Sequence, residues 1–165
     1  MKFAYADPPY YKHGKRLYSD LHKDAAIWDD QQSHLDLIEK LYKEYPDGFA
    51  ISCNPTDLSW ILVKYPELRV CVWAKSFHQI LAVTVQYAWE AVLLHGGRKV
   101  RTRKPMVRDW LSCRIAMKKN FPGAKPIEFN SWILDLLNYQ EGDQLDDLFP
   151  GTNGMAEAVE MRLSS

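Results

Sequence analysis

Residues 7–10, Asp-Pro-Pro-Tyr, combine groups that can hold a flat molecule carrying an amino group. The prolines fix their φ angles and lack N–H groups, so the stretch is stiff and extended and its carbonyl groups point outward. Asp7 adds a carboxylate acceptor, and Tyr10 adds an aromatic face on which a ring can stack. Two acceptors converging on one point suit a group with two N–H donors, such as the exocyclic amine of a nucleobase. An ordinary turn is the alternative interpretation.

A second stretch with chemical potential lies near the end of the chain, where residues 145–154 are LDDLFPGTNG. Glycine at positions 151 and 154 lets the backbone approach a ligand closely, and a helix that starts after the loop offers free N–H groups. A strand, a tight loop and a helix in this order predict a cradle for a cofactor. An ordinary strand-to-helix turn would have the same pattern.

Strands and helices alternate along the rest of the chain and must position these two loops. Short apolar runs bounded by Pro, Gly or Asn predict strands, and apolar residues spaced three and four apart predict helices. We expect strands at 2–6, 49–53, 68–74 and 143–149, with 84–95 forming either one long strand or two pieces. We expect helices at 33–45, 54–65 and 125–138, and a short one from Met155.

This alternation predicts an α/β fold, with a mostly parallel sheet covered by helices on both faces. Ligands of such sheets bind at the carboxyl ends of the strands, where both 7–10 and 150–154 fall. A chain of 165 residues is long enough for one compact core, so we expect a single domain, 1–165. Within it we distinguish a polar loop or lid at 11–30 and a basic segment at 96–119.

Composition argues against several classes of protein. Lys and Arg number 21, as do Asp and Glu, so a whole-molecule attraction to polyanions is not predicted. No apolar run is long enough to span a membrane, and we expect a cytoplasmic protein without a membrane partner. The three cysteines form no CxxC pair and no cluster with histidine, so we expect no metal site.

The basic segment differs from this neutral background, because between residues 98 and 119 nine basic residues face only one acid, Asp109. Basic side chains near phosphates add affinity for nucleic acid without reading its sequence. A solvated loop is the alternative. The candidate phosphate contacts are Arg98, Lys99, Arg101, Arg103, Lys104 and Arg108.

The order of these motifs resembles that of the amino-group DNA methyltransferases that depend on S-adenosylmethionine, of the N6-adenine type. The resemblance rests on the DPPY stretch near the start, on GAKPIEFNSWILDLL and on the later loop GDQLDDLFPGTNG. The segments CVWAK and YAWEAVLL are also similar, so the resemblance extends over most of the chain. It implies a Rossmann-like methyltransferase sheet in permuted order, with the catalytic motif first and the cofactor motif last.

The resemblance also implies roles for individual residues. Asp7 and the carbonyl of Pro8 would accept hydrogen bonds from the target amine, next to Pro9, and Tyr10 would stack on the base. The residues implied to bind S-adenosyl-L-methionine are Ala6, Asp7, Lys125, Pro126, Asp147, Phe149, Pro150, Gly151, Thr152 and Asn153. The implied reaction is direct attack of the amine on the sulfonium methyl group, with Asp7 orienting the amine and stabilising its developing positive charge. Adenine in duplex DNA would have to be flipped out to reach Asp7.

Two features depart from the family pattern. Asn153 stands where the family has glycine, and after glycine asparagine is the residue that best tolerates the left-handed backbone. Only 11 residues follow Gly154, so the edge strands that normally follow the cofactor loop are expected to be missing, and a homodimer or a partner subunit stays open. The alternatives are a catalytically degenerate module that binds nucleic acid or a partner, or an enzyme acting on RNA adenine or on cytosine N4.

Overall fold

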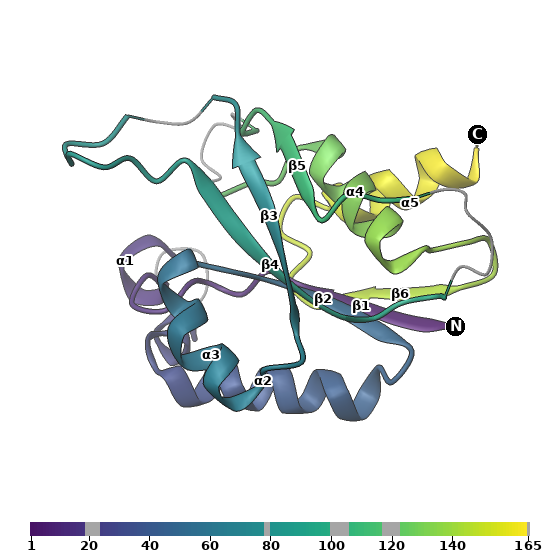
Figure 1. The fold of residues 1–165 in the computed structure, drawn as a ribbon, viewed down its shortest axis with the longest axis horizontal. Helices are drawn as coiled ribbons and strands as arrows, with labels where there is room; N and C mark the ends of the chain where they lie inside the picture. Colours follow the sequence, from purple (N-terminus) through teal and green to yellow (C-terminus); the bar gives the residue numbers. More distant parts are fainter. Residues whose placement is uncertain (19–23, 78–79, 100–105, 117–122, 165) are drawn as a thin grey trace.

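A six-stranded mixed sheet forms the centre of the described molecule (Figure 1). The computed structural model describes residues 1–18, 24–77, 80–99, 106–116 and 123–164. In spatial order the strands are β5 (Trp110–Cys113), β3 (Arg69–Lys75), β4 (Trp89–Gly96), β2 (Gly48–Cys53), β1 (Lys2–Ala6) and β6 (Gln144–Asp147). The helices are α1 (Gly14–Tyr18), η1 (Ala25–Asp29), α2 (Gln31–Glu44), η2 (Pro55–Asp57), α3 (Leu58–Lys64), α4 (Ile127–Leu137) and α5 (Gly154–Leu163).

Strand direction follows the parallel prediction except at β4. The pairings of β1 with β2, β1 with β6 and β3 with β5 are parallel, whereas β4 is antiparallel to both of its neighbours, β2 and β3. No helix separates β3 from β4 among the described residues of their connection, and a strand needs a crossover to return parallel. The expected strand at 84–95 begins only at Trp89, so its first five residues belong to this connection.

All the other strands run in the same direction, so their carboxyl ends lie together along one side of the sheet and their amino ends along the opposite side. We call the edge at which β1, β2, β3, β5 and β6 end the carboxyl edge, and the opposite one the amino edge. The two segments that sequence analysis selected, 7–10 and 150–154, come after β1 and β6, so both lie where the chain leaves the sheet at the carboxyl edge. The fold therefore brings the first and last motifs of the chain to neighbouring positions.

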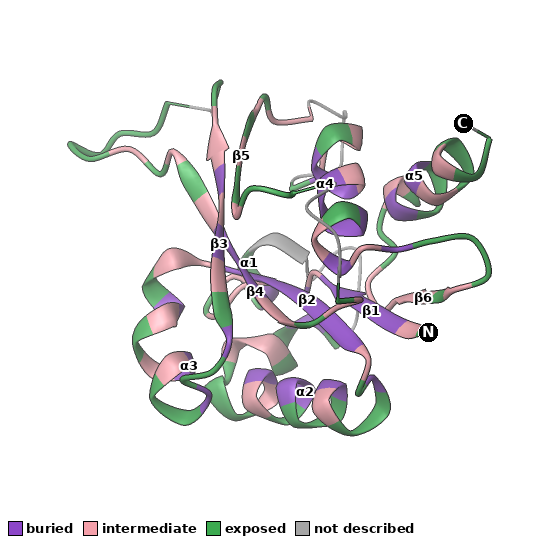
Figure 2. Ribbon diagram, turned by 45° about the vertical axis from the view of Figure 1, so that its right-hand side comes forward, coloured by how far each residue is buried: buried purple, intermediate pink, exposed green. Residues whose placement is uncertain are grey.

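Helices cover the two faces of the sheet, and each face has its own apolar core. Helices α2 and α3 lie on one face and α4 and α5 on the other (Figure 1). Alternation along β1 separates the two cores, because Ala4 and Ala6 face α2 whereas Phe3 and Tyr5 face α4. Strands β1 and β2 are buried almost throughout (Figure 2), which explains their nearly continuous apolar sequences.

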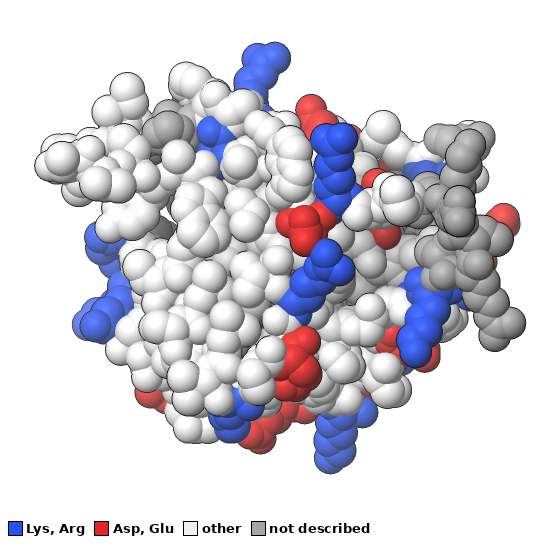
Figure 3. All heavy atoms as spheres, viewed as in Figure 1, with Lys and Arg blue, Asp and Glu red and all other residues white. Residues whose placement is uncertain are grey.

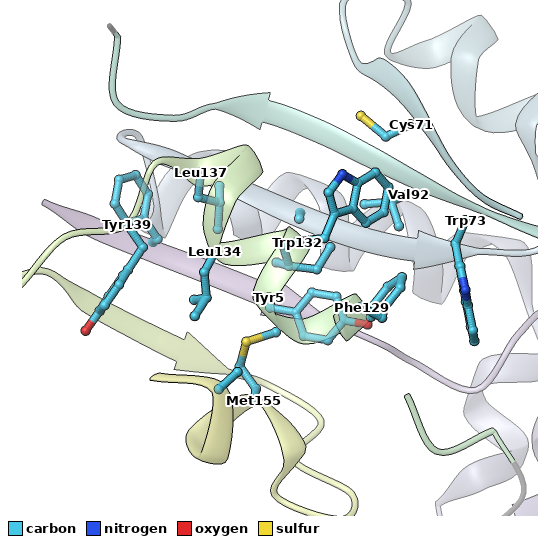
Figure 4. Packing of buried hydrophobic residues seen from close by; sticks show 14 residues of the cluster. Tyr5, Cys71, Trp73, Val92, Phe129, Trp132, Leu134, Leu137, Tyr139 and Met155 are labelled. Atoms are coloured by element: carbon cyan, nitrogen blue, oxygen red, sulfur yellow. The ribbon is translucent and has the colours of Figure 1, made fainter. Parts of the chain in front are cut away.

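The core beneath α4 is rich in aromatic rings (Figure 4). Phe129 is completely buried, and its ring lies 5.0 Å from that of Trp73 and 6.1 Å from that of Tyr5, measured between centroids. Apolar residues from the start and the end of the helix, including Leu137, complete this core. The packing fixes the beginning of α4 over the carboxyl half of the sheet, and this determines where Lys125, two residues before the helix, can reach.

The turn at Gly96 and Gly97 begins the basic segment at the amino edge. Gly96 has a φ of 65°, and a Cβ placed there would lie 2.7 Å from the carbonyl oxygen of Asp47. Because the φ is positive and the space is filled, only glycine fits at this position without strain. The chain after β4 therefore leaves the sheet on the side opposite to Asp7.

The described residues contain neither a membrane-spanning helix nor a metal-binding cluster. None of the helices there combines the length and apolar character needed to cross a membrane. Within the same ranges, His, Cys, Asp and Glu side chains form no group of three or more suited to a metal ion.

Candidate active site

Asp7 and Tyr10 border a cavity of about 760 Å³ at the carboxyl edge. Strand β1 ends at Ala6, so Asp7 is the first residue beyond the sheet, and Pro8 also lines the cavity. Pro9 is half-buried and does not line the cavity, whereas Ala6 is completely buried in the sheet. The stiff segment thus presents a carboxylate and an aromatic ring to a space large enough for a nucleobase and its sugar.

Asp7 is part of a buried ionic network centred on Lys125. The ammonium nitrogen of Lys125 lies 3.0 Å from Oδ1 of Asp7 and 3.0 Å from Oε2 of Glu90, and it donates to the hydroxyl of Tyr10 at 3.2 Å. The Tyr10 hydroxyl in turn donates a short hydrogen bond to Glu90. Lys75 completes the network at 2.6 Å from Oε1 of Glu90. The side chains of the four charged residues are 8–20% exposed, so water screens these contacts only weakly.

Burial and neighbouring charges shift the pKa values in this network. Burial raises the pKa of Asp7, and the nearby Lys125 only partly opposes this effect. Burial acts on Glu90 in the same direction, but Lys125 and Lys75 outweigh it and lower the pKa of Glu90 to about 2. Burial lowers the pKa of Lys125, yet Asp7 and Glu90 hold it well above its ordinary value. Glu90 is therefore the firmly ionised acid, and Asp7 is the more basic of the two carboxylates.

Aromatic and polar side chains form the walls of the cavity. Trp60 and Tyr11 meet edge to face with 6.0 Å between their ring centroids. Tyr87 approaches from the connection between β3 and β4, and Trp89 from the first position of β4. Asp57, at the start of α3, is 5% exposed, and burial raises its pKa to about 6. These walls offer stacking surfaces and one buried carboxyl group, which is the combination that a flat polar ring requires.

Sequence analysis did not select Glu90, Lys75, Asp57 or Trp60 as site residues. Glu90 lies 83 positions after Asp7 and reaches it only because β4 is inserted antiparallel between β2 and β3. The one signal for Glu90 was an acid next to a buried apolar run in the segment YAWEAVLL. Lys125 was selected, but as the start of a helix over the cofactor, whereas its ammonium group points to Asp7 and Glu90.

The loop after β6 has the backbone shape that the sequence predicts for a cradle. Gly151 and Asn153 have φ angles of 48° and 59°, so asparagine does adopt the left-handed conformation. A Cβ at Gly154 would lie 2.6 Å from the side-chain nitrogen of the buried Asn130, so the first turn of α5 is closely packed against α4. Pro150 and Thr152 lie in the same loop, exposed and half-buried, and Pro126 precedes the first residue of α4.

Asp147 ends β6 beside Tyr5 of β1, and it interacts electrostatically with Asp7. Burial raises the pKa of Asp147 to about 6, although its carboxylate accepts a hydrogen bond of 3.1 Å from the backbone N–H of Phe149. The ring of Phe149 packs on Trp28 of η1, with 5.2 Å between centroids. The segment expected to be a lid thus contacts the expected cofactor loop.

The described candidates for phosphate contact in the basic segment, Arg98, Lys99 and Arg108, are not brought together with Asp7. Arg98 lies at the amino edge, where its Nη2 is 2.6 Å from the buried carboxylate of Asp143, so it serves a structural ion pair. Arg108 lies two residues before β5 on the same side, with its guanidinium 5.6 Å from the centre of the Trp110 ring, and Lys99 is exposed beside Arg98. Arg101, Arg103 and Lys104 lie outside the described residues.

Basic side chains do line the cavity, and apart from Lys75 and Lys125 they come from the polar loop. Lys12, His13 and Arg16 belong to or flank α1, which is held to η1 by hydrogen bonds from the backbone N–H groups of Gly14 and Lys15 to Asp29. On the face shown in Figure 3, Lys and Arg are interspersed with Asp and Glu. Positive charge near the cavity therefore depends on residues 12–16, on Lys75 and on Lys125.

Comparisons with known proteins give matches in structure. No protein-family model matches the sequence, and no curated protein matches it significantly. The solved complex of M1.HpyAVI with SAM has a TM-score of 0.58 at 16% identity, covering 99% of this chain and 79% of that one. TTHA0409 from Thermus thermophilus, assigned as a DNA modification methylase, has a TM-score of 0.57 at 15% identity, with coverages of 98% and 77%. Its complex with S-adenosyl-L-methionine gives 0.55 at 16% identity, with coverages of 97% and 77%.

The similarity to these structures extends over 97–99% of this chain. At 15–16% identity the likeness concerns the path of the backbone. The chain therefore has the α/β Rossmann-like methyltransferase fold of M1.HpyAVI and TTHA0409.

Proposed function

We propose that the chain transfers a methyl group from S-adenosylmethionine to the exocyclic amino group of adenine in DNA. The observation that carries the proposal is the position of Asp7, a carboxylate of raised pKa at the end of β1, in a cavity with aromatic walls. The fold that the chain shares with SAM-bound M1.HpyAVI and with TTHA0409 supports the same reaction class. The amine chemistry of the DPPY segment supports adenine as the target.

The chain's residues would orient the amine and stabilise the charge that develops on it. Asp7 and the carbonyl of Pro8 would accept its two N–H groups, and the ring of Tyr10 would pack on the base. The Tyr10 hydroxyl is fixed by Glu90 and Lys125, so the ring is already oriented before the base arrives. Asp7 offers negative charge at the position where the nitrogen becomes positive, which lowers the barrier.

The loop after β6 fits the methionine part of S-adenosylmethionine. Asp147 supplies a carboxylate for its ammonium group, and the N–H groups at the start of the ten-residue helix α5 suit its carboxylate. Close packing at Gly154 leaves no room for a side chain at this position, so the backbone at the end of the loop stays bare. When bound, the cofactor supplies a methyl group on a sulfonium that an amine can attack. We assign its binding to Asp147, Phe149, Gly151 and neighbouring residues 150–153.

We propose that the polar loop, and not the basic segment, contacts the phosphates of the nucleic acid near the site. Lys12 and Arg16 line the cavity at its open side, and neither forms an ion pair among the described residues. Each basic side chain near a phosphate adds affinity that decreases with salt. The base itself would be extruded from the stack to reach Asp7.

The test is transfer of labelled methyl from S-adenosylmethionine to duplex and single-stranded DNA. Wild-type protein should label adenine-containing DNA, and Asp7→Asn should lower the rate by about 100-fold or more because the carboxylate's charge is lost. Asp36→Asn, on the exposed side of α2, is the matched control and should keep the wild-type rate. Folded wild-type protein that labels no DNA, or an Asp7→Asn variant as active as the wild type, would overturn the proposal.

A further inference from the structure

Glu90 occupies a central position in the buried network at Asp7. Its Oε1 is 2.6 Å from the ammonium nitrogen of Lys75, and its Oε2 is 3.0 Å from that of Lys125. Oε2 also accepts the hydrogen bond from Tyr10. Each carboxylate oxygen of Glu90 thus holds one lysine, and only one of these lysines, Lys125, also contacts Asp7.

The fold explains why these groups meet. Glu90 is paired with Trp73 across β3 and β4, and Lys75 lies two residues further along β3 on the same face. Lys125 reaches this face because it immediately precedes Pro126 and α4, whose first turn is fixed by the buried Phe129. The network therefore lies on the α4 side of the sheet, next to the end of β1.

The formal charges in the network cancel, since Lys75 and Lys125 balance Asp7 and Glu90. The balance depends on Glu90. Without it, two ammonium groups would face the single carboxylate of Asp7, and Lys125 would keep only Asp7 and the Tyr10 hydroxyl as partners. An ammonium group bound tightly to Asp7 takes the acceptor that an incoming amine requires, and a net positive charge repels a cationic ligand.

We propose that Glu90 is a positioning residue for methyl transfer: by holding Lys75 and Lys125 it keeps Asp7 available to the target amine and keeps the site free of net positive charge toward a sulfonium. This inference rests on the proposed function. It goes beyond that proposal because it assigns to a residue of β4, distant from both motifs in the sequence, the ability to discriminate a cationic from a neutral ligand.

The experiment compares binding of S-adenosylmethionine, which carries a sulfonium charge, with binding of S-adenosylhomocysteine, which lacks that charge. Calorimetry gives the ratio of the two dissociation constants without relying on turnover. In Glu90→Gln the side chain keeps its shape and loses its charge. The dissociation constant for S-adenosylmethionine should therefore rise by about tenfold relative to that for S-adenosylhomocysteine. This is the order expected for unit charges about 10 Å apart at an effective dielectric constant of about 20.

Two further variants separate charge from structure. Glu90→Gln combined with Lys75→Met restores the formal balance and should return the ratio to within about threefold of the wild-type value. Lys75→Met alone leaves one excess negative charge and should shift the ratio in the opposite direction, so the inference is testable even where Glu90→Gln fails to fold. Glu39→Gln is the matched control, because Glu39 pairs with Lys64 at the same 2.6 Å on the exposed surface. It should leave the ratio unchanged.

The possible results distinguish this inference from the proposed function. If both ligands bind and the ratio of their dissociation constants is the same in the wild type and in all variants, the role of Glu90 is overturned and the proposed function still stands. Binding of neither ligand to folded wild-type protein would overturn both. A ratio that follows the formal charge, and not the identity of the substituted residue, is the result that supports the inference.

Discussion

Substitution of Asp143 by asparagine should destabilise the protein, because Asp143 is the centre of an ion cluster at the amino edge. Its side chain is 3% exposed, and its carboxylate contacts the N-terminal ammonium group at 2.6 Å and Arg98 at 2.6 and 2.7 Å. It also accepts a hydrogen bond from the backbone N–H of Gln140. An asparagine amide cannot balance these two positive charges, and its NH₂ group would face other donors.

The pKa of Asp143 gives the size of the effect. Burial raises this pKa, but the hydrogen bonds from Arg98 and from the N-terminus outweigh burial and lower it from 3.8 to about 2. At about 1.36 kcal/mol per pKa unit this corresponds to about 2.4 kcal/mol of folding free energy. Because Arg98 and the N-terminus are each about 30% exposed and therefore partly screened, we expect a loss of about 2 kcal/mol at neutral pH.

The pH dependence of this contribution has a definite sign. The pKa of Asp143 is lower in the folded than in the unfolded protein, so its contribution is fully present above the unfolded value of 3.8. It is lost as the pH falls through about 2. Wild-type stability should therefore decrease between pH 5 and pH 2 by about 2 kcal/mol more than that of Asp143→Asn.

Urea denaturation followed by tryptophan fluorescence measures both effects, and thermal unfolding should show a decrease of about 4–8 °C in the melting temperature at pH 7. Asp109→Asn is the matched control, because Asp109 pairs with Arg69 at 2.7 Å on the exposed surface. This substitution should cause no measurable loss of folding stability. Equal destabilisation by the two substitutions would refute the argument that burial gives the Asp143 pair its strength.

Further predictions concern the loop after β6 and the cavity. Affinity for S-adenosylmethionine should fall as the pH drops through about 6, where Asp147 takes up a proton, and calorimetry should find no such dependence in Asp147→Asn. Gly154→Ala should cost about 1–3 kcal/mol of stability in urea denaturation, because its Cβ would lie 2.6 Å from the buried Asn130. Trp60→Ala should raise KM for DNA more than it lowers kcat in steady-state assays, since Trp60 lines the cavity without contacting Asp7.

The α/β fold and the positions of the two candidate loops could be predicted from the sequence because they depend on local signals. The prolines at 8 and 9 end β1, and the buried run 49–53 forms β2 as expected. Asn54 caps the next helical segment with a hydrogen bond of 3.1 Å from the N–H of Thr56, as the Asn-Pro start predicts. These features follow from backbone geometry and require no knowledge of distant contacts.

The antiparallel direction of β4 could not be predicted in the same way. It depends on where a strand is inserted in the sheet, and the order of elements in the sequence does not determine this. The consequence for the basic segment is direct, because a parallel strand ending near residue 95 would have delivered Arg98 to the carboxyl edge. The observed strand delivers it to Asp143 at the amino edge.

The partners of Asp7 were missed for a similar reason. Lys125 and Glu90 are 118 and 83 positions from Asp7, and each stands in a segment whose local pattern indicates only a helix start or a buried strand. An ion pair between such residues is visible only after α4 and β4 have been placed. Sequence motifs selected Asp7, whereas the burial and the neighbouring charges that shift its pKa come from tertiary structure.

The most direct test of the central claim is to identify the methylated nucleoside. DNA containing all four bases is incubated with the protein and S-adenosylmethionine carrying a deuterated methyl group, then digested to nucleosides and analysed by mass spectrometry. The account predicts deuterated N6-methyldeoxyadenosine from wild-type protein and none above background from Asp7→Asn. Deuterated label on cytosine alone, or no labelled nucleoside from folded protein that binds the cofactor, would contradict it.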